Sequence, residues 1–535
     1  MTVAYWEFRA LSTSHLHARF YCLLAAFWAS VFVAFLCPQQ AQAETRRISS
    51  TQMLRMLLQR NPSLLRERLT IEQAHADVNA ARGAFAFDLE LGLSLDRSNL
   101  PADMQVNPSL LSAVGDLDFQ TLRVDGSLLL SKRFETGTIV SMNYRSWWRQ
   151  QDQLDFAKAL QGSQDPLIDV QNASNTLLFQ VVQPLLKGAW FETNLAAIRQ
   201  AQERVSMAHQ QVKRLTSQLV LQAISYYWDL VYARQNIAIK RSALALAKKE
   251  LISTLALIKA GKRAAIEKYQ IKQVLAAREA EVLIAQDLIE QAETQLRILL
   301  HLPVTVTLIP TESPEQMRTS ATLTALMRAS MKRHPDIVSA MHALKVAQLG
   351  VVSSKNATLP ELNLQAGFTF VGFGRKSSDQ TTNVDPIGRS FGTMFDPRSN
   401  SFQVGITFKV PLDNRTAKNR LIREQIEIRR AQMQIMILRR KVALEVQQLY
   451  RNLRRAKLRM PISKASVVWA KKKLVAEREK LKADKSTLFA VLQYQQDLAT
   501  AQLTIVKNWV DYQKVHASLL EKTGALLKAY NIVKK

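Results

Sequence analysis

Two stretches of this chain are long, rich in helix-forming residues and poor in helix breakers. The first runs from Gly188 to about Ile258 and contains no Pro. The second runs from Leu412 to about Lys480 and contains Pro461, which we expect to kink the helix. A helix of about 70 residues is about 105 Å long at a rise of 1.5 Å per residue. Helices of this length would project far beyond a globular core, so they predict a tube or a coiled coil.

A shorter helical segment follows each long one, at Ala264–His301 and at Ser486–Tyr530. In the first of these, apolar or small residues recur every seven positions in two sets. The sets are Val282, Ile289 and Leu296, and Ala285, Ala292 and Leu299. Small residues in such a seam let two helices approach closely. The helices of each half are therefore predicted to pack closely side by side.

The chain also contains one layout twice. Asn61-Pro62 opens about 25 residues of helix-permissive sequence that lead into an alternating apolar run, and His334-Pro335 opens a second such segment. Pro suits the first turn of a helix, and the change of period from 3.6 to 2 predicts a helix followed directly by a strand. We therefore expect two internal structural repeats, residues 44–310 and residues 311–535.

The N-terminus reads as a secretory signal peptide over residues 1–43. Basic residues precede an apolar block, and the block ends in the small-residue site Ala41-Gln42-Ala43, after which we expect cleavage. An uncleaved membrane anchor is the alternative. Both cysteines, Cys22 and Cys37, lie inside this segment, so the mature chain is expected to contain neither a disulfide nor a reactive thiol.

Alternating apolar and polar residues predict strands in two clusters. They are Asp88–Arg97, Thr121–Ser131, Thr138–Trp148 and Thr176–Gln183 in the first repeat, and Glu361–Phe373 and Ser401–Val410 in the second. After Ala43 no run approaches 18 consecutive apolar residues, so strands rather than helices are expected to cross any membrane. Long polar loops such as Lys376–Asn400, set against a tight turn at Lys132–Gly137, show the asymmetry of outer-membrane barrels.

The charge of the chain is extreme, at +28. Residues 413–482 alone contain 21 Lys or Arg against 6 Asp or Glu. Such a balance favours nucleic acid, anionic lipid or anionic cargo as partners. Because a signal peptide removes the chain from cytoplasmic nucleic acid and no base-reading motif is present, we expect no nucleic acid partner. A solvated wall or contact with an acidic partner is preferred, and the direction in which these basic residues face is left open.

No motif predicts catalysis. Gly388-Arg389-Ser390-Phe391-Gly392 matches the nucleophile-elbow pattern, but it falls in a predicted polar loop rather than in a strand–turn–helix. The eight His residues are scattered without the spacing of a zinc site. We therefore expect no enzyme, no metal and no cofactor. The aromatic stripe Tyr226, Tyr227, Trp228 and Tyr232 is interpreted as packing between helices.

Two short motifs occur once in each of the two repeats. The predicted strand-to-helix joints read Gln183-Pro184-Leu185-Leu186-Lys187-Gly188 and Val410-Pro411-Leu412-Asp413-Asn414. The predicted hairpin tips read Ile258-Lys259-Ala260-Gly261 and Leu481-Lys482-Ala483-Asp484. In their order, spacing and twofold repetition these motifs resemble the TolC-like family of outer-membrane efflux proteins, over essentially the whole mature chain.

The resemblance implies a mainly α fold with a β-barrel part, assembled as a homotrimer. Each chain would add strands to a shared β-barrel in outer-membrane lipid and helical hairpins to a periplasmic α-barrel. The assembly would be a passive exit duct for a tripartite efflux pump or a type I secretion system. A periplasmic adaptor (membrane fusion protein) and an inner-membrane pump would dock at its lower end. The alternative is a periplasmic coiled-coil adaptor or structural protein, which would lack the outer-membrane strands.

The chain departs from the family in its first half, which holds about four strand candidates where the family usually has two. Whether Thr121–Trp148 adds barrel strands or forms a separate hairpin is open at this point. The sequence also leaves open the cargo, the partner pump, and the choice between drug efflux and protein secretion.

The two hairpin tips are expected to form the periplasmic end and the adaptor contact. Gly261 suits a left-handed backbone and Asp484 tolerates one. The neighbouring cations Lys262 and Lys485 would then lie at the same end of the molecule.

The resemblance also locates a candidate gate. Family members place acidic side chains just after the second tip, and the matching positions here are the neutral Ala490 and Gln493. An acidic residue follows the first tip as Glu267, and Lys482 stands close to Lys485. We hypothesise an entrance that prefers anions or is weakly cation-selective, closed in part by Glu267 pairing with a cation such as Lys485. In the alternative, the lysines face outward to an acidic adaptor.

Overall fold

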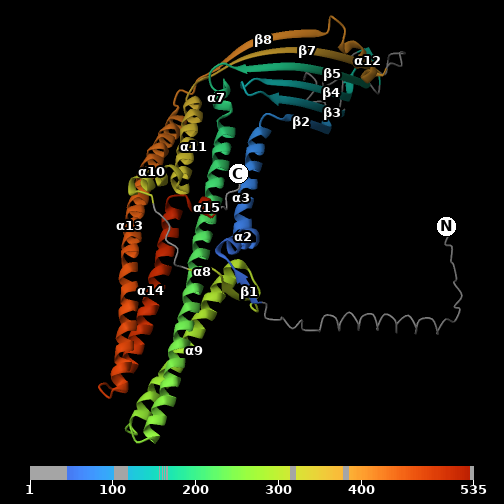
Figure 1. The fold of residues 1–535 in the computed structure, drawn as a ribbon. Coiled ribbons are helices and arrows are strands. Elements are labelled where there is room, and N and C mark those ends of the chain that lie inside the picture. Colours follow the sequence, from blue (N-terminus) through green and yellow to red (C-terminus); the bar gives the residue numbers. More distant parts are fainter. Residues whose placement is uncertain are drawn as a thin grey trace, which may run out of the picture.

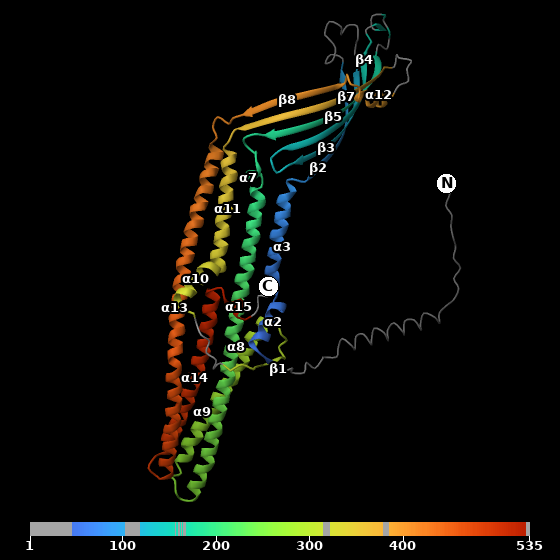
Figure 2. The same ribbon diagram turned by 45° about the horizontal axis from the view of Figure 1, so that its top comes forward.

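The computed structural model describes residues 45–101, 118–155, 167–313, 321–377 and 385–530, together with positions 157, 158, 161 and 163. The predicted signal peptide lies outside the described residues. The molecule is elongated, with a sheet at one end and long helices that run away from it (Figures 1 and 2).

The two long helices are α8 (Ala196–Lys259) and α13 (Arg415–Lys482). Each forms a hairpin with the next helix along the chain, α9 (Glu267–Leu300) or α14 (Leu488–Lys522), as predicted. Helix α13 remains one helix through Pro461. The seam residues Ala285, Ala292, Leu296 and Leu299 are buried.

The helices form a single layer rather than a bundle. Near the sheet, α3 (Pro62–Gly83) packs on α8, and α11 (Pro335–Ala357) lies between α8 and α13. Farther from the sheet, α9 packs on α8, and α14 lies between α8 and α13 (Figure 1). The layer therefore has two open sides, one formed by α3 and α9 and the other by α13.

Helices α3 and α11 begin in the same way. The side-chain oxygen of Asn61 accepts a hydrogen bond from the N–H of Leu64 at 3.2 Å, and Nδ1 of His334 accepts one from the N–H of Asp336 at 3.3 Å. Each of these caps is followed by Pro at the first helical position. Among the described helices, α11 is also long and apolar enough to span a membrane, by length and composition alone.

Small elements surround the middle of the helical layer. They are β1 (Thr45–Ile48), which pairs in parallel with β6 (Thr307–Pro310), and the helices α2 (Ser50–Arg60), α10 (Leu323–Arg333) and α15 (Leu526–Ala529). The largest hydrophobic core lies here and includes Tyr227 and Trp228. Burial raises the pKa of the Tyr227 hydroxyl to about 12, and the nearby Glu312 carboxylate acts in the same direction. The aromatic stripe is a packed band, as predicted.

Six strands of the described chain form one antiparallel sheet in the order β2-β3-β4-β5-β7-β8. Their bounds are β2 (Phe87–Pro101), β3 (Asp118–Arg133), β4 (Ile139–Leu154), β5 (Leu167–Pro184), β7 (Glu361–Ser377) and β8 (Asn400–Lys409). All six predicted strands are therefore present. The segment Thr121–Trp148, whose place the sequence left open, lies inside the sheet as β3 and β4, between β2 and β5.

The predicted loop Lys376–Asn400 was only partly right, because it contains a helix, α12 (Pro386–Met394). Asp385 caps this helix by accepting hydrogen bonds from the N–H groups of Ile387 and Gly388. Helix α12 packs on β5 and β7, where the buried Ser390 hydroxyl donates to the Ile387 carbonyl (2.7 Å) and accepts from Nδ2 of Asn175 (2.6 Å). Ser390 is thus a packing contact on the sheet rather than an exposed nucleophile.

Candidate functional site

The two hairpin tips are built by the same turn. At the first tip, Lys262 N–H bonds to the Leu257 carbonyl and Gly261 N–H to the Ile258 carbonyl, at 2.9 and 3.0 Å. At the second tip, the N–H groups of Lys485 and Asp484 bond to the carbonyls of Lys480 and Leu481, at 2.9 and 3.3 Å. This double bonding is the Schellman motif, which satisfies the last carbonyls of a helix.

The Schellman motif needs a left-handed residue just past the helix end, and both tips supply one. Gly261 has φ +71° and Asp484 has φ +54°. A Cβ added at Gly261 would meet nothing within 4 Å, so only the backbone conformation favours glycine there. The predicted turn positions therefore lie at corresponding points of the two tips.

Arg263, a residue that the sequence did not single out, joins the two tips. Its guanidinium donates to the Leu481 carbonyl (3.2 Å) and lies 3.2 Å from the Glu267 carboxylate and 3.9 Å from that of Asp484. Only 12% of the Arg263 side chain is exposed, whereas Asp484 is almost fully exposed. The hydrogen bond to Leu481 is therefore the main connection, because solvent screens the outer ion pair.

The other predicted gate residues do not form one cluster, because each contacts a different neighbour or solvent. Glu267 pairs with a tip cation, Arg263, whereas the sequence analysis had given Lys485 as its example of such a cation. Lys482 pairs with Glu479 on its own helix at 2.8 Å. Lys262 and Lys485 are exposed. Ala490 N–H is capped by the Thr487 hydroxyl at 3.3 Å, and the Gln493 side chain donates to Asp497 at 3.3 Å.

The strand-to-helix joints form a second site at the opposite end of the helical layer. Pro184 ends β5, and the next N–H, of Leu185, bonds to the Leu362 carbonyl at 2.8 Å. Gly188 N–H bonds to the Asn356 side chain at 2.8 Å. The Lys187 ammonium lies 2.9 Å from the Glu361 carboxylate. The first joint is thus fastened to the turn between α11 and β7.

The joint containing Pro411 is held to the same turn. Asn414, just beyond it, donates from Nδ2 to the Thr358 carbonyl at 2.9 Å. Lys409 lies 3.8 Å from the Glu361 carboxylate, on the side opposite Lys187. A single carboxylate is therefore placed between cations from two joints, and a cavity of about 340 Å³ lies among these residues and Pro411.

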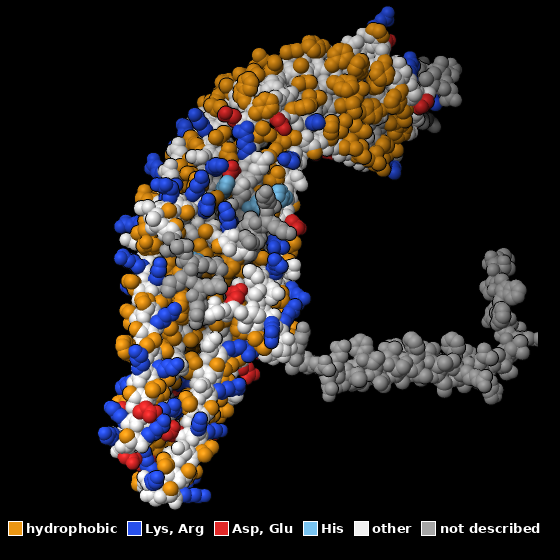
Figure 3. Space-filling model, in the orientation of Figure 1, with side chains coloured by type: hydrophobic (Ala, Val, Ile, Leu, Met, Phe, Trp, Pro, Cys, Tyr) orange, Lys and Arg blue, Asp and Glu red, His pale blue; other side chains and the backbone are white. Residues whose placement is uncertain are grey.

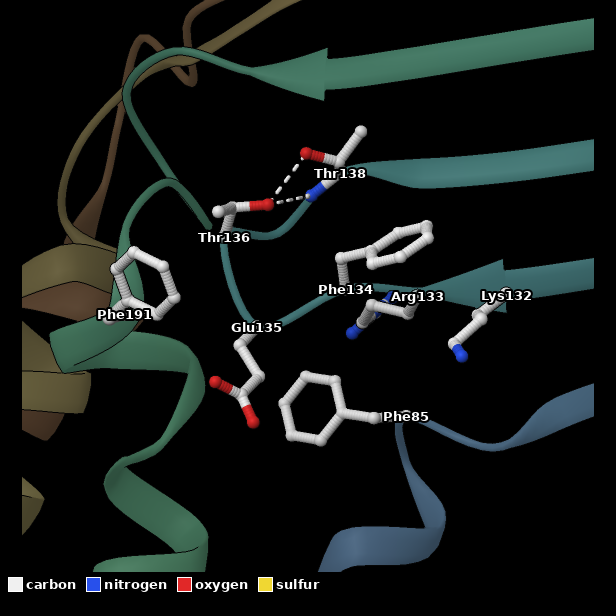
Figure 4. Close-up of a pocket in the computed structure, with 8 residues that line it drawn as sticks. All are labelled: Phe85, Lys132, Arg133, Phe134, Glu135, Thr136, Thr138 and Phe191. Carbon is white, nitrogen blue, oxygen red and sulfur yellow. Dashed lines mark hydrogen bonds between the residues drawn. The ribbon is translucent and has the colours of Figure 1, made fainter.

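The turn between β3 and β4 also reaches this level. It lines a cavity of about 670 Å³ together with Phe85, which precedes β2, and Phe191 of α7 (Phe191–Asn194) (Figure 4). Figure 4 shows the Glu135 side chain of the turn extending toward the Phe85 ring, with the Phe134 ring nearer Thr138. Helix α7 follows the first joint directly, so the turn is packed against the place where β5 becomes helical.

The two faces of the sheet differ in chemistry. The paired register places apolar residues of successive strands side by side on one face. This apolar face includes Leu89, Leu91 and Leu93 of β2, Leu128 and Leu130 of β3, Met142 and Tyr144 of β4, Leu177 and Phe179 of β5, Phe368 of β7, and Phe402, Val404 and Ile406 of β8. The polar face includes Ser94, Ser127, Asn143, Thr176, Gln365 and Gln403. Figure 3 shows apolar side chains gathered over the sheet and cations along the helices.

The sheet ends in two strands that each have one neighbour within the described chain, β2 and β8. Their apolar side chains are highly exposed; Leu93, for example, is 83% exposed and Phe402 70%. Strand β2 follows α3, and β8 leads into α13. The open edges of the sheet therefore continue the open sides of the helical layer.

Comparison with known proteins was made by sequence and by structure. Residues 326–525, which run from α10 to the end of α14, match the family model described as outer membrane efflux protein. The resemblance to outer-membrane efflux proteins is confirmed. Comparison with curated proteins gave no match. Among the described residues, no group of three His, Cys, Asp or Glu side chains is placed to hold a metal ion.

Solved outer-membrane channels share the fold. The outer membrane protein VceC from Vibrio cholerae is 16% identical, with a TM-score of 0.60 over 89% of this chain and 96% of that chain. The Campylobacter jejuni outer membrane channel CmeC is 12% identical (TM-score 0.57, 89% of this chain and 86% of that one). The open state of the Neisseria gonorrhoeae channel MtrE is 14% identical (TM-score 0.56, 89% of each chain). At these identities the likeness shows the fold of the chain, which is mostly helical with a sheet at one end.

Proposed function

We propose that this protein is the outer-membrane exit duct of a tripartite efflux pump or a type I secretion system. Three copies would enclose a passive channel that extends from the outer membrane into the periplasm. The observation that carries the proposal is the wall-like form of the chain. Its sheet has one apolar and one polar face. The unpaired edges of the sheet, β2 and β8, lie on the same two sides of the molecule as the unpaired edges of the helical layer.

An open sheet with a broad apolar face cannot stay exposed to water, and its unpaired edges cannot face lipid. Both problems disappear if β2 of one copy pairs with β8 of the next and the sheet closes. The apolar face would then meet outer-membrane lipid and the polar face would line water. The same operation would bring α13 of one copy beside α3 and α9 of the next. Three copies follow from the family resemblance.

The two structural repeats, residues 44–310 and 311–535, are part of this proposal. The shared caps at Asn61 and His334, and the shared tip turns at Gly261 and Asp484, support a duplication. The tips lie at the end of the helices away from the sheet (Figure 1). We place them in the periplasm, where an adaptor and an inner-membrane pump would dock.

The competing proposal, a periplasmic coiled-coil adaptor, does not account for the six-stranded sheet. Residues such as Leu93 would remain in water, and a contiguous apolar face of this size marks a lipid or protein contact. We therefore prefer the outer-membrane duct.

A matched pair of substitutions on β2 tests the proposal. Leu93→Arg changes the apolar face and Ser94→Arg changes the polar face of the same strand. Arg on the lipid face of a barrel costs up to about 2–4 kcal/mol, whereas a lumen position tolerates charge. We expect the wild type and Ser94→Arg to yield a heat-modifiable, channel-forming oligomer in outer-membrane fractions, and Leu93→Arg to yield much less. Equal yields, or a wild type found soluble in the periplasm, would contradict the proposal.

A further inference from the structure

We propose that β3 and β4 form part of the barrel wall, so that each chain contributes six strands and the trimer closes an 18-stranded barrel. This inference rests on the proposed function. It goes beyond the function because it sets the width of the exit. It also identifies the segment that would widen the barrel, residues 118–154, which has no counterpart between β7 and β8.

The register shows that the hairpin is an integral part of the sheet. Strand β3 pairs with β2 from Phe87↔Lys132 to Pro101↔Asp118, and β4 pairs with β5 from Ile139↔Val182 to Leu154↔Leu167. Strands β2 and β5 have no direct pairing, since β3 and β4 separate them. A hairpin outside the wall would instead leave β2 and β5 as neighbours.

The chemistry of the two faces also continues through the hairpin. On the apolar face, Leu128 lies opposite Leu91 of β2 and opposite Tyr144 of β4. On the polar face, Ser127 lies opposite Gly92 and Arg145. Strands that only bordered water would not need one apolar face, whereas strands in a barrel wall need the same alternation as their neighbours.

The turn of the hairpin is fastened to the joint at the base of the sheet. The Thr136 carbonyl accepts a hydrogen bond from Trp190 N–H at 3.0 Å, and the Thr138 hydroxyl donates to the Gln183 side chain. Gly137 (φ +93°) sits so close that an added Cβ would lie 2.2 Å from the Gly188 carbonyl oxygen. The turn thus ends at the same level as the other strands.

The number of strands sets the width of a closed barrel. Strands about 4.8 Å apart and tilted by about 40° each occupy about 6 Å of the circumference. Eighteen strands then give a backbone-to-backbone diameter of about 36 Å, whereas twelve would give about 24 Å. Because side chains occupy several ångströms on each wall of both barrels, the ratio of the two open cross-sections is larger than the ratio of the squared backbone diameters. The exit would therefore pass bulkier cargo than a four-stranded chain would allow.

Single cysteines test the inference without removing any strand, because the mature chain is expected to contain no other cysteine. We would compare Leu128→Cys with Ser127→Cys on β3, and Leu91→Cys with Ser94→Cys on β2, in outer-membrane vesicles. The probe is a charged, water-soluble maleimide. If β3 lies in the wall, Ser127→Cys reacts at least tenfold faster than Leu128→Cys, and the β2 pair shows the same contrast.

The two pairs separate the two proposals. If the β2 pair shows the contrast and both β3 cysteines react equally fast, the hairpin lies outside the wall and this inference is wrong. If neither pair shows it, there is no barrel, and the proposed function fails as well. Electron cryomicroscopy of the trimer gives a second readout. Eighteen strands are expected in cross-section for the wild type and twelve after deletion of residues 118–154, and twelve in the wild type would overturn the inference.

Discussion

The guanidinium of Arg263 donates a hydrogen bond to the main-chain carbonyl of Leu481, 218 residues away in the sequence, at 3.2 Å. This contact joins the tips of the two helical hairpins within one chain. The surrounding apolar contacts among Ile271, Leu488 and Leu492 are also shared between α9 and α14. Arg263 adds a directional, charge-assisted bond to this packing, so we expect it to restrain separation of the tips.

Substitution of Arg263 by Ala should loosen the tips. A hydrogen bond from a charged group contributes about 1.5–3 kcal/mol, and each 1.4 kcal/mol changes an equilibrium about tenfold. We expect the fraction of time that the channel spends open in planar bilayers to rise by about tenfold or more.

Lys262→Ala is the matched control, since it removes an exposed cation one residue away. It should leave channel opening close to that of the wild type. Equal opening in both variants would show that the Arg263 bond does not restrain the tips.

The backbone at Gly261 provides a second prediction. Because a Cβ would meet no neighbour, Gly261→Val perturbs the turn only through the cost of a left-handed conformation, about 1–2 kcal/mol. We expect reduced export with normal trimer assembly, measured as drug susceptibility of cells and as heat-modifiable trimer on gels.

Asp484→Gly is the complementary change at the second tip, where φ is already +54°. Glycine adopts this conformation more readily than Asp, so this variant should retain export. If Gly261→Val exports like the wild type, the turn is not critical to docking or opening.

The strands and hairpins were predictable because their signals are local. Alternation placed all six strands, and the Pro62 and Pro335 positions marked two helix starts. Helix α12 was missed although its signal was present, because Asp385-Pro386 is a cap followed by Pro at the first helical position. The polar composition around it suggested a loop, but packing on β5 and β7 stabilises the helix.

The link made by Arg263 was not predictable in this way. Its main partner is a carbonyl, which every residue has, and that carbonyl lies in the other hairpin. The hypothesis that Glu267 pairs with a tip cation such as Lys485 used charge alone, and the tip cation that pairs with it within the chain is Arg263, four residues before Glu267.

The cations at the second tip give a prediction about ion selectivity. Lys482 pairs with Glu479, but both side chains are largely exposed (73% and 64%), so the pair is weak. With Ala490 and Gln493 neutral, we expect an entrance that prefers anions or is only weakly cation-selective. Reversal potentials in a salt gradient should shift toward cation selectivity, by several-fold in permeability ratio, in the double variant Lys482→Glu/Lys485→Glu.

The alternative role of these lysines gives a different pattern. If they face an acidic adaptor, the double variant should lose export and adaptor crosslinking while its reversal potential stays unchanged. Strong cation selectivity in the wild type, unaltered in the variant, would rule out the proposed entrance.

The cap of α11 provides the last prediction. Burial lowers the pKa of His334 from its ordinary 6.5 and outweighs the nearby Asp336 carboxylate, which raises it; Lys522 then lowers it further and Glu445 raises it, both by smaller amounts. The neutral ring is the form that accepts the Asp336 N–H. A base with a lowered folded-state pKa takes up its proton more readily when unfolded, so its contribution to stability is present above pH 6.5 and declines as the pH falls below that value.

Hydrogen exchange at the start of α11 should therefore accelerate between pH 7.5 and pH 5.5, after correction for the intrinsic rate. His334→Asn should abolish this dependence and keep the cap, because Asn61 caps α3 in the same way. His75→Asn, a change on α3, is the control and should retain the wild-type dependence. A loss of protection at low pH that persists in His334→Asn would assign it to another group in this region. Glu521 cannot be that group, because burial raises its pKa and a raised carboxyl pKa stabilises the fold as the pH falls. With the cap intact and the titration removed, the start of α11 should stay protected at pH 5.5, where the wild-type helix is expected to lose protection.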